Sequence, residues 1–113
     1  MHELSIVESL LSVALEHAEK AEAEKILKIN LVVGELAGVV RESVEFYFTF
    51  LSKDTVASQA IIHFNWIPAK FRCRNCGEIF VPERLSYTCP SCGDRQLDVI
   101  AGRELYIESL EVE

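Results

Sequence analysis

The sequence predicts an α+β protein, in which a small antiparallel or mixed sheet carries two helices on one face and a cysteine-rich module is inserted before the last strand. Three observations favour this class: helical spacing of apolar residues near the N-terminus, short alternating segments further along, and two closely spaced pairs of cysteines. With 113 residues, of which 50% are hydrophobic, the chain is long enough to bury an apolar core.

The first two elements are predicted from opposite periodicities. Residues 4–25 predict an amphipathic helix, because apolar residues recur at intervals of three and four with glutamates between them. Residues 26–33 predict a strand that ends at Gly34, because β-branched residues are frequent and apolar and polar residues alternate. We expect the inward side chains of this strand to be Leu27, Ile29, Leu31 and Val33.

The remaining elements follow the same logic. Residues 41–53 predict a second helix, although their aromatic content would also suit a strand. Residues 62–66 predict a strand before Pro68, and residues 97–100 and 104–112 predict two strands near the C-terminus. The inward parity of the last strand changes between Ile107 and Leu110, which predicts a β-bulge near Glu108 or Ser109.

The four cysteines predict a metal site. Cys73 and Cys76 form one CxxC pair, and Cys89 and Cys92 form another. Zinc binds four thiolates at tetrahedral corners, and two intervening residues let one tight turn present both sulfurs to a single ion. Gly77 and Gly93 each follow the second cysteine of a pair, where a turn requires positive φ. We expect a zinc-ribbon-like domain at residues 70–95, and a second domain formed by residues 1–69 and 96–113.

Other cysteine chemistries fit the pattern less well. Disulfides would require an oxidising compartment, but the N-terminus shows no signal-peptide pattern and no apolar run reaches the length of a membrane span, so we expect a cytoplasmic protein. A thioredoxin-like redox site would place its CxxC at the start of a helix, whereas Pro90 and the glycines favour turns. Iron stays open, because four thiolates suit it as well as zinc.

Charge and motifs argue against two classes of function. The net charge of −7 leaves little basic surface for phosphate recognition, so we expect no nucleic-acid partner, and we expect no membrane partner either. The motifs GxSxG, HExxH and GxGxxG and the P-loop are absent from the chain, so we expect no enzymatic activity. His17 and His63 are interpreted as surface residues.

His2 has a chemical option that the other histidines lack. Its imidazole, its own backbone nitrogen and the terminal amine of Met1 can form fused chelate rings around one ion, with Glu3 as a further donor. Such nitrogen-rich sets suit Ni(II) and Cu(II). A histidine after the start methionine is nevertheless usually accidental, so the pattern alone is weak.

Several segments, taken in order, carry a family resemblance. They are MHELS at residues 1–5, VGEL at 33–36, RES at 41–43 with Phe46 and Phe48 after it, and the CxxC pairs. Over essentially the whole chain they resemble the HypA/HybF family of hydrogenase nickel-insertion accessory proteins. The resemblance implies a nickel metallochaperone with His2 as nickel ligand, the Met1 amine and Glu3 as co-ligands, and zinc held by the four cysteines.

The resemblance also implies partners. These are a GTPase accessory protein of HypB type and the precursor of a [NiFe]-hydrogenase large subunit, with a homodimer as a further option. Some members carry a carboxylate in the loop before the second helix; this chain has Val39 and Val40 there, with Glu35 and Glu42 nearby. Two rivals remain from the cysteines alone: a zinc-ribbon interaction module of the transcription or translation machinery, and a rubredoxin-like electron carrier.

Overall fold

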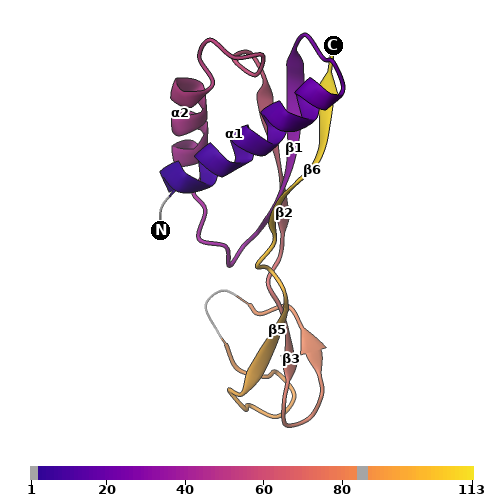
Figure 1. The fold of residues 1–113 in the computed structure, drawn as a ribbon. Coiled ribbons are helices and arrows are strands. Elements are labelled where there is room, and N and C mark those ends of the chain that lie inside the picture. The colour runs from indigo at the N-terminus through magenta and orange to yellow at the C-terminus, as the bar shows by residue number, and fades with distance from the viewer. Residues whose placement is uncertain (1–2, 84–86) are drawn as a thin grey trace.

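The protein is built from two three-stranded sheets that follow one another along an elongated molecule of 55 × 24 × 17 Å (Figure 1). This computed structural model describes residues 3–83 and 87–113. We call the part with both helices and the sheet β2-β1-β6 the helical half, and the part with the sheet β4-β3-β5 the ribbon half. The elements are α1 (Glu3–Lys20), β1 (Ile26–Gly34), α2 (Arg41–Leu51), β2 (Ile61–Ile67), β3 (Lys70–Cys73), β4 (Ile79–Phe80), β5 (Leu97–Ala101) and β6 (Leu105–Val112).

Helix α1 buries the face that its apolar spacing predicts, through Val7, Leu11, Ala14 and Ala18. It ends at Lys20, earlier than the predicted residue 25. The reason is a left-handed residue, Glu22, whose φ is 54°, after which the N–H of Ala23 donates back to the carbonyl of Ala18 at 2.9 Å. This reversal satisfies a carbonyl that the helix end would leave unpaired.

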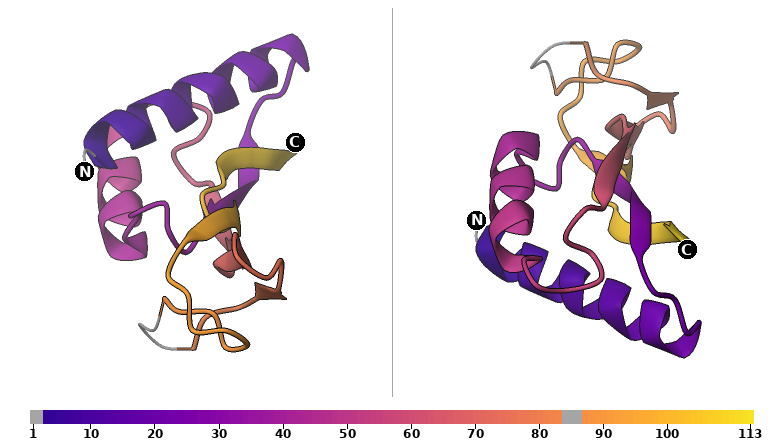
Figure 2. Two further views of the ribbon diagram at one scale, coloured as in Figure 1. Left: turned by 90° about the horizontal axis from the view of Figure 1, so that it is seen from below. Right: turned by 90° about the horizontal axis from the view of Figure 1, so that it is seen from above.

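Helix α2 confirms the helical alternative for residues 41–53. Val44 and Phe48 are buried and Tyr47 and Leu51 are partly buried, all packed in the core that α1 and the first sheet share. Figure 2 shows both helices on the same side of this sheet, as predicted. Within the described residues, no helix combines the length and the apolar character needed to cross a bilayer.

The first sheet is mixed, because β1 lies in the centre, parallel to β2 and antiparallel to β6. The predicted bulge is confirmed: Asn30 pairs with Ser109 and Leu31 with Ile107, which leaves Glu108 without a partner residue. The predicted inward position of Leu27 is wrong. Leu27 is 42% exposed and Ile26 is fully buried, because a second irregularity between Ile26 and Lys28 changes the parity at the start of β1.

Strand β5 does not join the helical half, in contrast to the expectation that residues 96–113 return to the first sheet. It pairs with β3, and β6 alone pairs with β1. Alternation predicts the faces of a strand but not its neighbour. Here residues 70–73 and 97–101 flank the cysteine pairs, and their pairing places Phe71 inside the ribbon half, next to Phe80 and Tyr87.

The two halves meet at a tightly packed junction. The N–H of Leu36 donates to the carbonyl of Gly102 at 2.7 Å, and the N–H of Ala69 donates to the Glu35 carboxylate at 2.6 Å. Gly34 lies against the same backbone so closely that a Cβ there would stand 2.0 Å from the carbonyl oxygen of Gly102. Glycine is therefore required at position 34 by the close approach of two backbone segments.

Ser52 offers a test of the helical core. Its side chain is fully buried just after α2, and its Oγ has no hydrogen-bond partner among the described residues. We expect Ser52→Ala to raise the free energy of unfolding by about 1 kcal/mol, because an unpaired buried hydroxyl costs that order of free energy. Urea denaturation of both proteins measures the change, and a less stable variant would contradict the assignment of an unpaired hydroxyl.

Candidate metal centre

The structure brings all four predicted cysteines together at the end of the ribbon half. Their Sγ atoms lie within 4.8 Å of one another, with 3.5 Å between Cys73 and Cys92 and between Cys76 and Cys89. Cys73 and Cys89 are buried, whereas Cys76 and Cys92 are exposed. Among the described residues, no other cluster of three or more histidines, cysteines or carboxylates has this geometry.

Two similar turns present the sulfurs. In each turn the glycine N–H donates to the carbonyl of the first cysteine of the pair, from Gly77 to Cys73 at 2.9 Å and from Gly93 to Cys89 at 2.8 Å. Gly77 has a φ of 80° and Gly93 a φ of 75°, which confirms the predicted positive values. A residue with a Cβ would be strained at either position, so the local backbone of each CxxC turn depends on glycine.

Hydrogen bonds make the thiols unequal. Hydrogen bonds from the Asn75 side chain, which has the larger effect, and from the backbone N–H of Asp94 lower the pKa of the Cys92 thiol to about 7. The backbone N–H of Glu78 lowers the pKa of the Cys76 thiol, but the neighbouring Cys89 thiol, partial desolvation and the other two cysteines together outweigh it and raise the pKa to about 12. Cys76 therefore keeps its proton at neutral pH until a cation replaces it, and metal loading releases protons. Sequence reasoning missed Asn75, although its place inside the first CxxC is the signal that could have found it.

The donor set fits a four-coordinate ion. Zinc–sulfur bonds of about 2.3 Å at tetrahedral angles separate the sulfurs by about 3.8 Å, close to the separations that the cysteines adopt. Disulfides do not fit, because the sulfurs of a disulfide lie about 2.05 Å apart, whereas all four cysteines are free thiols. Four thiolates also leave no open position for exchange or catalysis, which indicates a structural site.

The predicted nickel ligand His2 and its neighbour Met1 lie outside the described residues. Glu3 is the first described residue, and its Oε2 accepts a hydrogen bond from the N–H of Val40 at 3.1 Å. Val40 is the N-cap of α2 and its side chain cannot cap the helix. In many helices a glutamate of the first turn accepts the hydrogen bond from the N-cap N–H. For α2 this role falls to Glu3 of the other helix, so the contact joins the starts of α1 and α2.

The other histidines and nearby carboxylates have ordinary positions. His17 and His63 are exposed, as predicted, on α1 and β2. The Glu35 carboxylate bonds to Ala69 at the junction between the halves. Glu42 lies in the first turn of α2, two residues after the Val40 N–H that Glu3 contacts.

Comparison with known proteins gives one consistent result. Residues 1–112 match the family model described as "Hydrogenase/urease nickel incorporation, metallochaperone, hypA". A hydrogenase maturation factor HypA from Dehalococcoides mccartyi is 51% identical over 113 residues, which covers 100% of this chain and 95% of the relative. The factor of the same name from Caldanaerobacter subterraneus is 42% identical over 114 residues and is covered completely, as is this chain.

Solved structures agree with the sequence relatives. The solution structure of the Ni metallochaperone HypA from Helicobacter pylori has a TM-score of 0.68 and 30% identity, covering 99% of this chain and 97% of that one. A second solution structure of a HypA protein has a TM-score of 0.74, 29% identity, and coverage of 100% and 97%. The match spans the helical half and the ribbon half alike, and the chain therefore belongs to the HypA family of nickel metallochaperones for hydrogenase maturation, which are not enzymes.

Proposed function

We propose that the chain binds Ni(II) at its N-terminus through His2 and delivers it to the precursor of a [NiFe]-hydrogenase large subunit in the cytoplasm. The observation that carries this proposal is the family match, which starts at residue 1 and so includes Met1, His2 and Glu3. The imidazole, a backbone nitrogen and the terminal amine form a nitrogen-rich set of the kind that Ni(II) prefers. Because a few donors at a chain end form an open site, nickel can be released by ligand exchange.

Glu3 acts as a co-ligand through the oxygen that its helix contact leaves available. The hydrogen bond to Val40 occupies Oε2, and Oε1 has no bond among the described residues. The contact also places the start of α1 beside the first turn of α2, where Glu42 lies. Of the two carboxylates near the loop, Glu42 is the better additional donor, since Glu35 is bonded to Ala69.

The ribbon half is proposed as a structural zinc domain. Cys73, Cys76, Cys89 and Cys92 would hold the ion, and zinc would fix the two CxxC turns without exchanging ligands. We propose residues 70–101 for this domain and residues 1–69 and 102–113 for the nickel-binding domain, a division that the pairing of β5 with β3 supports. We further propose a GTPase accessory protein of HypB type as the nickel-transfer partner.

Metal analysis of untagged protein tests the proposal. We expect one zinc per chain as purified, and one further nickel after addition of Ni(II) and removal of excess. An iron-loaded red protein would support an electron carrier, and zinc without any nickel uptake would favour a zinc-ribbon interaction module.

The position of an affinity tag tests the amine ligand. An N-terminal extension removes the Met1 amine from the chelate, so we expect it to weaken nickel binding by more than about tenfold. The same tag at the C-terminus is the matched control and should leave nickel affinity unchanged, because that end of the chain carries none of the proposed nickel ligands. Calorimetric titration with Ni(II) compares the two proteins, and equal affinities would exclude amine ligation.

A further inference from the structure

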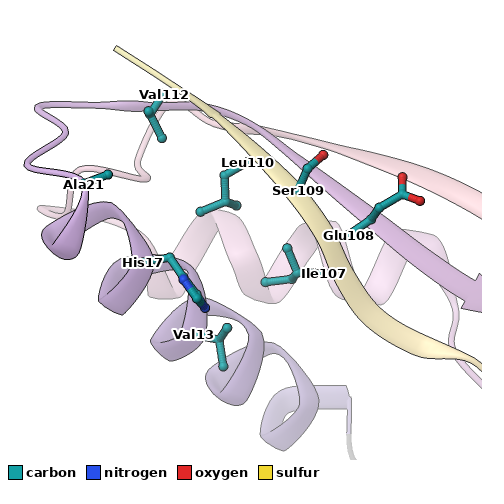
Figure 3. A pocket seen from close by; sticks show the side chains of 8 residues that line it. All are labelled: Val13, His17, Ala21, Ile107, Glu108, Ser109, Leu110 and Val112. Carbon is teal, nitrogen blue, oxygen red and sulfur yellow. The ribbon is translucent and has the colours of Figure 1, made fainter.

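A groove runs between α1 and β6 on the helical half, away from the cysteine cluster. It consists of two hollows of about 510 and 340 Å³, both of which are lined by Val13 of α1 and Ile107 of β6. Figure 3 shows the second hollow, where Ile107 and Leu110 point toward the helix and Glu108 points away from it. Val13 is 44% exposed, so the groove presents apolar surface to solvent.

Strand β6 borders this groove with a free edge. It pairs with β1 on one side, and no strand pairs with its other side among the described residues. An edge strand directs alternate N–H and C=O groups outward, where they can pair with another extended chain. Alternate side chains of a strand added here would face the groove. Its two hollows meet at Ile107, the β6 residue that lines both of them.

The charge of the chain is concentrated on α1 and on the C-terminal residues 104–113, which include β6. Residues Glu3–Lys20 contain four glutamates and one lysine, and residues 104–113 contain four glutamates and no lysine or arginine. Their net charges of −3 and −4 together equal the −7 of the whole chain, so the rest of the chain is neutral on balance. An occupant of this groove therefore meets a negative potential.

We propose that the groove between α1 and β6 is the docking site of an extended, basic segment of a partner protein. The segment adds to β6 as a further strand, places apolar side chains in the groove and pairs lysine or arginine, on the side turned away from the helix, with Glu108. A second copy of this chain is a poorer occupant, because two β6 edges would bring eight glutamates of residues 104–113 together. The proposal does not depend on nickel binding.

An alternating arginine–valine peptide of about eight residues, the length that spans β6, serves as the probe. Added to the zinc-loaded full chain labelled with ¹⁵N, it should shift amide signals of α1 and β6 and leave α2 unaffected. Two versions of the peptide are N-methylated, one at every valine and one at every arginine. At least one should bind about tenfold more weakly or worse, because it lacks the N–H groups that pair with β6.

Protein variants complete the test. Val13→Arg places a cation in the groove and should weaken peptide binding by about tenfold or more, whereas Val56→Arg, at a similarly exposed valine outside the groove, should change it less than about twofold. Equal binding by both variants, undiminished binding of both methylated peptides, or shifts confined to other elements would overturn the proposal. A concentration-dependent dimer whose β6 amides are protected from exchange would also overturn it, in favour of a second copy.

Discussion

His2→Ala is expected to abolish specific nickel binding, with an apparent affinity more than about 100-fold weaker. Loss of a hydrogen bond that supports a metal ligand lowers metal affinity about 10- to 100-fold, and loss of the ligand itself should lower it further. Zinc content and fold should be unchanged, because the cysteine cluster lies in the ribbon half and Glu3 still contacts Val40. Nickel titration of the untagged protein, together with zinc analysis, measures both effects.

His63→Ala is the matched control for this variant. His63 is an exposed histidine on β2, distant in sequence from the N-terminus, and its removal should leave nickel affinity unchanged. If His2→Ala bound nickel as the unmodified protein does, the N-terminal site would be wrong even though the family assignment would stand. Hydrogenase maturation in cells that depend on this protein should fail with His2→Ala and proceed with His63→Ala.

Gly34→Ala is expected to lower the free energy of unfolding by about 3 kcal/mol or more. The new Cβ would lie 2.0 Å from the carbonyl oxygen of Gly102, and backbone atoms cannot move aside as a flexible side chain can. The two halves would have to separate locally, which also weakens the bond between Leu36 and Gly102. Urea denaturation of the zinc-loaded protein measures the loss.

Gly38→Ala is the matched control, because it tests the cost of a left-handed backbone conformation without any steric clash. Gly38 has a φ of 73° and open space around its Cα, so alanine there costs only the left-handed conformation, about 1 kcal/mol. At Gly34, in contrast, a steric clash with the backbone of Gly102 excludes a side chain. If Gly34→Ala were as stable as Gly38→Ala or more stable, the backbone at the junction between the two halves would be less tightly packed than the distance between Gly34 and Gly102 indicates.

Periodicity predicted the features that depend on one segment alone. The buried face of α1 and the bulge at Glu108 follow from local spacing, and the glycine turns follow from the CxxC pattern. The position of β5 could not be predicted in this way, because alternating residues are compatible with either sheet. The end of α1 was missed for a different reason, since Glu22 is not a residue type that usually adopts positive φ.

The same distinction between local and long-range features applies to the candidate sites. The cysteine cluster was predictable because its ligands form two local turns that need only be brought together once. The contact between Glu3 and Val40 joins residues 37 positions apart and depends on how two helices pack, for which the sequence contains no direct signal. The proposal of His2 as nickel ligand rests on family resemblance, since a histidine at position 2 has no diagnostic spacing of its own.

The junction has a consequence for how such a protein can change over evolutionary time. The chain leaves the helical half after Ala69 and returns at Gly102, and a Cβ built on Gly102 would lie 2.9 Å from the Cα of Ala69. The two ends of the ribbon half are therefore adjacent, as in a domain inserted into a single loop. An insertion of different length or with a different ligand set can replace it while the strand order β2-β1-β6 of the helical half stays the same.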